Sequence, residues 1–349
     1  MAYITFQPKD YFNTKLYSGT GSTASITGVG FRPDWVWIKD RASTEHHNLF
    51  DVVRGATKRI YTSSAAMEDT AATTLTSFDS DGFSLGSSGA VNASGNNTVS
   101  WNWRAAGGQG SSNTDGSINT TYTSANTTSG FSISTYTGTG SNATVGHGLG
   151  VAPTVVWIKK RSGGGNEGMY AYMKEIGAGN QLSISETEPA AAGSSLFQST
   201  DPTSSVFSIG THASVNNSSS EYVAYSFTPI KGYSKFGKFT GNGNVNGPMI
   251  YTGFKPAWVL IKCTSYGGQN WTLFDNKRDP NNEMIRQLQI NNTSAEDANL
   301  TYNDIDCLAN GFKVREDNDN VNRDNETYIF MAFAEVPIVA SNGDPATAR

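Results

Sequence analysis

The stretch GFRPDWVWIKDR, Gly30 to Arg41, decides the fold because the chain repeats its pattern twice more. GVAPTVVWIKKR (Gly150–Arg161) and GFKPAWVLIKCT (Gly253–Thr264) also place a glycine three residues before a proline and a lysine six residues after it. A short apolar run between Gly/Pro and charged residues is typical of a buried strand. Proline has no N–H to donate and therefore suits the first position of such a strand. We expect the same buried strand in all three places.

Two further landmarks follow each copy in the same order. A turn with a strand comes first, and a closing aromatic strand comes second. The proline and the aromatic strand are separated by 68, 69 and 72 residues, from Pro33 to Trp101, Pro153 to Tyr222 and Pro256 to Tyr328. Spacings of this size fit whole domains better than a solenoid repeat. The sequence therefore predicts an all-β protein with three tandem β-sandwich (jelly-roll-like) domains from an internal repeat.

Composition and landmarks also set the predicted domain boundaries. The tract between the first two copies, Gly107–Gly130, has almost no apolar residue beyond Ile118 and Tyr122, so it cannot bury enough surface to fold alone. The predicted division is an N-terminal attachment segment (1–15), a first unit (16–107), a Gly/Ser/Thr/Asn-rich linker (108–129), a second unit (130–230), a third unit (231–338) and a C-terminal tail (339–349).

Charge and hydropathy exclude several classes of protein. The chain has 349 residues and a net charge of −5, and its charged residues make up 16%, below the ~25% usual for soluble domains. We therefore expect no nucleic-acid binding, since there is no basic footprint. We also expect no membrane insertion, since no apolar run approaches ~20 residues. The first residues lack a basic and then apolar pattern, so we expect no secretion signal. Cys263 and Cys307 are then expected as buried thiols, with a disulfide between neighbouring strands as the alternative.

The bulky residues of the repeated strands are predicted to form a core layer. Side chains two positions apart on a strand point to the same face. Trp35 and Trp37 therefore share one face, and Trp157 and Trp258 occupy matching columns in the other two copies. An aromatic platform that binds sugar would have the same pattern, but a buried layer explains all three copies without a ligand.

A second short motif occurs in two of the copies. Leu-Phe-Asp precedes an arginine by three positions at Asp51 and Arg54, and again at Asp275 and Arg278. The second copy has MYAYMK (Met169–Lys174) instead. A carboxylate and a guanidinium at this spacing predict a structural ion pair that holds a loop to a sheet. A ligand clamp is the alternative reading.

Candidate metal and catalytic residues are sparse. Asp317, Asp319 and Asp324 are weak calcium candidates, because the loop lacks the Gly at position six and the bidentate Glu at position twelve of the helical calcium loop. His46 and His47 are adjacent, so on a strand they would face opposite sides and could not grip one metal. No nucleophile elbow, zinc motif or Ser/His/Asp set occurs. We therefore expect no enzyme, no metal and no cofactor.

Several segments carry a resemblance to a known class of proteins. It is strongest in the first unit, in FQPKDYFNTKLYSGTGS (Phe6–Ser22), LFDVVRGATK (Leu49–Lys58) and SFDSDGFSLG (Ser77–Gly86), and it extends to Gly130–Arg161. The first-unit segments, together with GFRPDWVWIKDR, resemble sequences of tail-fibre and other virion structural proteins of marine bacteriophages, and Gly130–Arg161 is similar to a module recurrent in phage tail proteins generally. The resemblance covers essentially the whole chain. It implies a β-sandwich module that builds virion appendages, is often oligomeric and has no catalytic residues.

The sequence and the resemblance together predict the function. We expect a non-enzymatic virion structural protein, namely a tail fibre, spike or capsid-decoration subunit assembled in the host bacterial cytoplasm. Its expected partners are other virion proteins and further copies of itself, with a trimer favoured. The alternative is an adhesin that binds a host-surface glycan. A polysaccharide depolymerase is a third class and would need a carboxylate pair about 5–10 Å apart in a groove.

Overall fold

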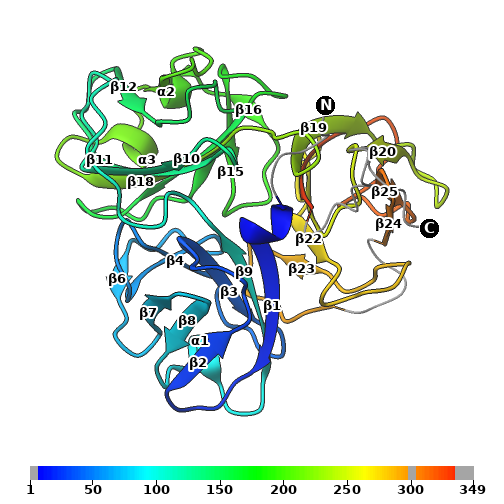
Figure 1. The fold of residues 1–349 in the computed structure, drawn as a ribbon. Coiled ribbons are helices and arrows are strands. Elements are labelled where there is room, and N and C mark those ends of the chain that lie inside the picture. The colour runs from blue at the N-terminus through cyan, green and yellow to red at the C-terminus, as the bar shows by residue number, and fades with distance from the viewer. Residues whose placement is uncertain (1–6, 298–303, 335–349) are drawn as a thin grey trace.

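The computed structural model describes residues 7–297 and 304–334, and within them the chain is mostly β structure. Its strands form six separate sheets (Figure 1), and the paired strands within each sheet are antiparallel. The predicted all-β class is confirmed at this level. The chain is described below in three parts, residues 7–107, 108–230 and 231–334, which Figure 1 draws as three lobes around a common centre.

The first part contains a six-stranded sheet and a three-stranded sheet. Between the 3-10 helix η1 (Pro8–Asp10) and the last strand lies one short helix, α1 (Gly89–Asn92). The large sheet has the order β1 (Phe12–Ser18), β9 (Asn97–Trp103), β3 (Trp35–Asp40), β4 (Asn48–Asp51), β5 (Lys58–Tyr61) and β6 (Asp69–Thr70); the small sheet has the order β2 (Ala24–Thr27), β8 (Gly82–Leu85) and β7 (Leu75–Asp79).

The second part contains a seven-stranded sheet and a two-stranded sheet. Two short helices, α2 (Ser194–Phe197) and α3 (Ala213–Asn216), flank the second strand of the small sheet. The large sheet has the order β10 (Tyr122–Asn126), β11 (Phe131–Thr137), β18 (Glu221–Phe227), β13 (Val155–Lys160), β14 (Tyr170–Met173), β15 (Asn180–Ser183) and β16 (Ala191–Ala192); the small sheet pairs β12 (Ala143–Gly146) with β17 (Val206–Ile209).

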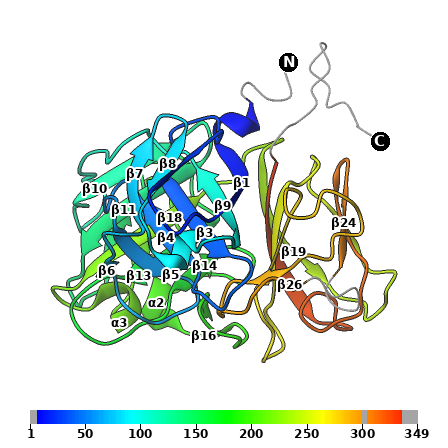
Figure 2. The same ribbon diagram turned by 90° about the horizontal axis from the view of Figure 1, so that it is seen from below.

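The third part contains a five-stranded sheet and a three-stranded sheet. The large sheet has the order β19 (Ser234–Thr240), β26 (Thr327–Phe333), β21 (Trp258–Cys263), β22 (Thr272–Asp275) and β23 (Leu288–Gln289); the small sheet has the order β20 (Met249–Tyr251), β25 (Gly311–Val314) and β24 (Ile305–Leu308). In Figure 2, β19 and β26 lie on the side of this part that faces the rest of the molecule, and β24 lies on the far side.

The three proline-led strands, β3, β13 and β21, occupy the same place in their sheets. Each lies between the closing aromatic strand and the strand that follows it along the chain. All six residues of each strand are buried, because the two faces of the strand contact two different cores. Val36 and Ile38 point toward the small sheet of the first part, where they pack in one cluster with Phe83. The alternate tryptophans point the other way.

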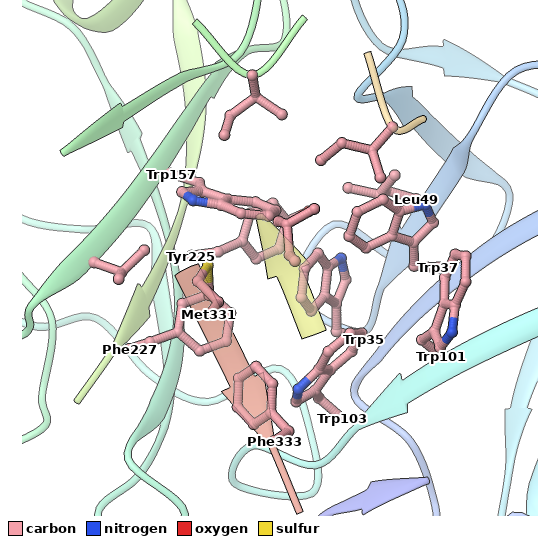
Figure 3. Packing of buried hydrophobic residues seen from close by; sticks show 14 of the residues in the cluster. Trp35, Trp37, Leu49, Trp101, Trp103, Trp157, Tyr225, Phe227, Met331 and Phe333 are labelled. Atoms are coloured by element: carbon pink, nitrogen blue, oxygen red, sulfur yellow. The ribbon is translucent and has the colours of Figure 1, made fainter. Parts of the chain in front are cut away.

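The alternate residues of all three large sheets meet in one central core. Trp35, Trp37, Trp157 and Trp258 belong to a single cluster whose members run from Phe12 to Phe333, and each of these tryptophans is at most 1% exposed. The ring centroid of Trp37 lies 6.2 Å from that of Trp157 and 6.4 Å from that of Trp258. Figure 3 shows side chains from different parts of the chain packed against one another in this core. The tryptophan face is therefore shared between the parts.

The segment 108–129, predicted as a linker, contains strand structure. Its residues Tyr122–Asn126 form β10, which pairs with the edge strand β11. Ile118 forms a parallel bridge with Val145 of β12 and is 8% exposed. A segment poor in apolar side chains can still join a sheet, because a strand added to an existing edge is held by backbone hydrogen bonds.

The predicted N-terminal attachment segment also overlaps a sheet. Strand β1 begins at Phe12, and the ring of Phe12 lies 4.9 Å from that of Trp103 and 5.5 Å from that of Phe333. Residues 12–15 of the expected attachment segment therefore belong to the large sheet, since Phe12 is an apolar anchor in the central core. Residues 1–6 and the predicted tail, 339–349, lie outside the described residues.

Candidate functional site

The two Leu-Phe-Asp motifs form buried ion pairs. Asp51 ends β4 opposite Trp35, and Asp275 ends β22 opposite Trp258. A turn then brings the arginine back, so that Nε of Arg54 donates to Oδ2 of Asp51 over 2.5 Å, and Arg278 does the same to Asp275. The backbone N–H groups of both arginines also donate to the same carboxylates. All four side chains are 0% exposed.

The first ion pair extends across the boundary between the first and second parts. Oε2 of Glu68 accepts hydrogen bonds from Nη1 of Arg54 over 3.0 Å and from Nε of Arg161 over 2.9 Å. Arg161 directly follows β13 in the second part. The hydroxyl of Tyr225 on β18 donates to Oδ2 of Asp51 over 2.7 Å. We call this group of five residues the first seam.

The second ion pair repeats this arrangement between the third and first parts. Oε2 of Glu296 accepts from Nη1 of Arg278 over 3.0 Å and from Nε of Arg41 over 2.8 Å. Nε1 of Trp101 on β9 donates to Oδ2 of Asp275 over 2.9 Å. Trp101 corresponds to Tyr225 of the first seam, because Trp101 pairs with Trp37 of β3 as Tyr225 pairs with Trp157 of β13. We call these five residues the second seam.

The boundary between the second and third parts has the same geometry, but the five corresponding positions carry no charge. Met173 pairs with Val155 as Asp51 pairs with Trp35. The backbone N–H of Ala190 donates to the backbone carbonyl of Thr264 over 2.9 Å. In the same way, the backbone N–H groups of Glu68 and Glu296 donate to the backbone carbonyls of Arg161 and Arg41. All five positions are neutral together, and this third seam consists of Met173, Ile176, Ala190, Thr264 and Met331. A lone buried charge is strongly destabilising, so the seam carries either the whole charged set or none of it.

Three buried lysines connect the parts in a cycle. They are the lysines that follow each repeated proline by six positions, and each is 0% exposed: Lys39, Lys159 and Lys262. Nζ of Lys39 donates to the carbonyl of Thr293 in the third part, 3.1 Å away. Nζ of Lys159 donates to Ser64 in the first part (3.0 Å) and Nζ of Lys262 to Thr187 in the second part (2.9 Å). Burial lowers the pKa of each lysine to about 8.

The Asp–Arg pairs of the charged seams offer fixed charges and no access for a ligand, because their side chains are 0% exposed. Burial alone would lower the pKa of Arg54, but the neighbouring Asp51 carboxylate, with Tyr225 and Glu68, raises it above its ordinary value. Burial acts to raise the pKa of Glu68, but Arg161 and Arg54 hold it below its usual value. Glu68 and Arg54 therefore stay ionised near neutral pH. The predicted ion pairs join parts of the chain to one another, and a ligand clamp does not fit side chains that solvent cannot reach.

The other sequence candidates do not come together. Asp319 accepts a 2.5 Å hydrogen bond from Arg323, and Asp324 accepts one of 2.9 Å from Asn325. Residues 7–297 and 304–334 contain no group of three or more His, Cys, Asp or Glu side chains that could hold a metal ion. Cys263 and Cys307 are buried free thiols.

Sequence reasoning missed the partners that complete the seams. The repeated lysine was visible in all three proline-led strands, but no role was assigned to it. Arg41 and Arg161 stand two residues after that lysine, where the third copy has Thr264. The neutral Thr264 lies at the boundary with the second copy, which is the copy that lacks the Leu-Phe-Asp motif. The joint absence was the signal available in the sequence, whereas Glu68 and Glu296 had no marker.

The tryptophans lie in the core, and only a few tyrosines among the described residues are exposed. All seven tryptophans are buried, so none forms a sugar-binding platform on the surface. Among residues 7–297 and 304–334, the exposed large aromatic side chains are Tyr122, Tyr251 and Tyr266. The guanidinium of Arg323 covers the ring of Tyr266 at 3.8 Å from its centroid. The ring of Tyr251, at 59% exposure, borders a groove of ≈ 240 Å³ between β19 and β20.

Comparison with known families gives one assignment. The sequence matches the family described as a domain of unknown function (DUF7483) over residues 7–337. The chain belongs to the DUF7483 family. Because the match runs through all three parts, a DUF7483 domain comprises the three large sheets together with their common core. Neither the curated proteins nor the solved structures include a match. None of the helices in the described ranges has the length and apolar character needed to cross a bilayer.

Proposed function

We propose that this DUF7483 protein is a non-enzymatic structural subunit of a bacteriophage virion: a tail fibre, spike or capsid-decoration protein. The observation that carries the proposal is the cycle of buried contacts, in which each part donates a lysine to the next and all three share one core. A chain built in this way is a rigid block, since no part can move without exposing tryptophan and unpairing buried charge. Rigidity without an accessible polar site suits a load-bearing subunit.

We further propose that the three parts are copies of one β-sandwich module. The support is the shared order of their large sheets, β1-β9-β3-β4-β5, β11-β18-β13-β14-β15 and β19-β26-β21-β22-β23. A separate apolar cluster between the large and small sheet of each part adds to this support. In this proposal the module buries one face of its large sheet in its own core and the other against its two neighbours.

The proposed partners are other virion proteins and further copies of the chain. With 16% charged residues, the protein has much Ser, Thr, Asn and Gly surface that can pack against neighbours without burying unpaired ions. A homotrimer remains the favoured assembly, on the ground of the resemblance to tail-fibre proteins. The adhesin alternative has weaker support, because the tryptophans are buried and Arg323 covers the ring of Tyr266.

Particle composition tests the proposal. Virions of a phage that encodes this chain would be purified by density gradient, analysed by quantitative mass spectrometry and labelled with a gold-conjugated antibody. We expect the protein in intact particles at a fixed copy number and the label at one location. A protein found in the lysate and missing from purified particles would refute a structural role in the virion.

A further inference from the structure

The second part of the chain fills the open edge of its own sheets with a plug segment. Strand β10 covers β11 at the edge of the large sheet, and Ile118 reaches β12 at the edge of the small sheet. The N–H of Ile118 donates to the carbonyl of Thr144 over 3.0 Å. Its side chain belongs to the apolar cluster between the two sheets. This plug, residues 110–126, is a template for what an open edge of this kind can bind.

The corresponding edge of the third part is open and forms a groove. Ile250 of β20 pairs with Phe312 as Val145 of β12 pairs with Phe207, so Ile250 stands where the plug contacts the second part. The groove of ≈ 240 Å³ lies at this position, between β19 and β20. β19 is the end strand of its sheet, so a further strand can be added beside it.

The groove exists because a glycine replaces a larger residue on β19. Gly237 lies opposite Phe330, as Lys15 of β1 lies opposite Ser100. In the first part the Lys15 side chain spans the edge, and its Nζ lies 3.0 Å from where a Cβ on Gly28 would stand. In the third part no side chain arises at Gly237, so Phe330 and Ile250 become the apolar floor. Within the described residues, Lys15 spans the edge of the first part and the plug covers the edge of the second, whereas in the third part Lys235 crosses to the carbonyl of Tyr251 and the groove remains beside it.

The rim of the groove indicates the chemistry of its ligand. Met249 and Tyr251 of β20 are 43% and 59% exposed and lie together along the groove. The groove is lined by Lys235 and Lys238, and Nζ of Lys238 lies 3.8 Å from Oε2 of Glu175 in the second part, so Lys235 carries the positive charge that a ligand would meet. Nζ of Lys235 donates to the carbonyl of Tyr251 over 2.7 Å and lies 5.2 Å from the centre of its ring. A basic rim around an apolar floor favours a ligand with an aliphatic side chain and a neighbouring carboxylate.

We propose that the groove between β19 and β20 binds an extended segment of a partner protein by strand addition. The segment adds main-chain hydrogen bonds along β19, places an aliphatic side chain over Ile250 and sets a carboxylate beside Lys235. Strand addition gives affinity through the backbone and specificity through alternate side chains. This inference goes beyond the virion proposal and does not depend on it, because it rests on the surface of the third part alone.

The test uses the purified full chain and a fluorescent peptide with the sequence of residues 110–126, which contains Asp115 and Ile118. Fluorescence anisotropy should show saturable binding, and the same peptide with Ile118→Asp should bind at least about tenfold more weakly, since a charge cannot enter an apolar pocket. Binding should also weaken as salt rises, because the rim is basic.

Two protein variants locate the site, and a third is the control. Met249→Asp and Lys235→Glu change exposed or half-buried rim residues, and each should weaken binding about tenfold or more. Lys58→Glu makes the same charge change on a lysine of the first part, whose Nζ donates to the hydroxyl of Thr70, and should leave binding unchanged. Circular dichroism would verify that all three fold. No saturable binding up to about 1 mM peptide, or equal loss in all three variants, would overturn the inference and leave the virion proposal untouched.

Discussion

Replacing Arg54 by methionine should destabilise the protein far more than the loss of one surface arginine. Its guanidinium makes hydrogen bonds of 2.5–3.1 Å to Asp51, Glu68 and the carbonyls of Leu49 and Lys58. Removing it leaves the Asp51 carboxylate buried without its guanidinium partner. Breaking a buried pair by deleting one partner costs about 3–5 kcal/mol, so we expect the free energy of unfolding to fall by that amount.

The third seam supplies the compensating set of substitutions. A variant that carries its residues in the first seam should recover most of the lost stability, because replacing a buried ionic group by apolar residues is often neutral or stabilising by about 1–4 kcal/mol. The five changes are Asp51→Met, Arg54→Ile, Glu68→Ala, Arg161→Thr and Tyr225→Met.

Urea denaturation followed by tryptophan fluorescence measures both effects. Arg59→Met is the control, since the Arg59–Asp69 pair has a 2.6 Å contact but a half-exposed carboxylate and should contribute only about 0–1 kcal/mol. A loss below about 1 kcal/mol for Arg54→Met would refute the reasoning. So would a fivefold variant no more stable than the single one.

Three further predictions follow from the core, the lysines and the thiols. Trp37→Ala should cost about 3–5 kcal/mol in urea denaturation, as for other buried aromatics, and a cost below about 1 kcal/mol would place the side chain outside the core. The folded-state pKa of the buried lysines, about 8, lies below the unfolded value of ~10.4, so the unfolded chain binds more protons and stability should rise from about pH 8 to pH 9.5. Lys159→Met should flatten part of this rise, and an unchanged slope would contradict the assignment. Burial raises the pKa of Cys307 to about 12, so this thiol should resist iodoacetamide at about pH 8 until the protein is unfolded. Cys263 is 0% exposed and should be protected by burial; rapid labelling of the native chain would show that the thiols are accessible.

The sequence predicted the local elements of the fold well because their signals are local. Gly-x-x-Pro with an apolar run marked the central strand of each large sheet, and alternation grouped Trp35 with Trp37. Alternation identifies a buried face but does not say what covers it. The meeting of three such faces in one core depends on contacts between residues more than a hundred positions apart, and no spacing in the sequence encodes them.

The ion pairs and the linker show the same limit. The three-residue spacing of Asp51 and Arg54 predicted a pair, since one turn brings the two side chains together. Glu68 and Arg161 join that pair from loops of different parts, so only the folded chain reveals them. The segment 108–129 has no apolar core of its own, as its composition indicated, but hydrogen bonding to the β11 edge depends on backbone geometry and leaves no trace in composition.

The lysine cycle has a consequence for how copies of the chain can associate. Head-to-tail contacts either close into a ring or continue as an open filament. Here the lysine contact occurs three times, once between each pair of parts, and the three contacts form a closed cycle within a single polypeptide. These contacts are therefore all used within the chain and cannot recruit another copy. Growth into a longer appendage must therefore proceed through other surfaces, such as the exposed strand edges, and the length of any polymer is set independently of the contacts that hold each subunit together.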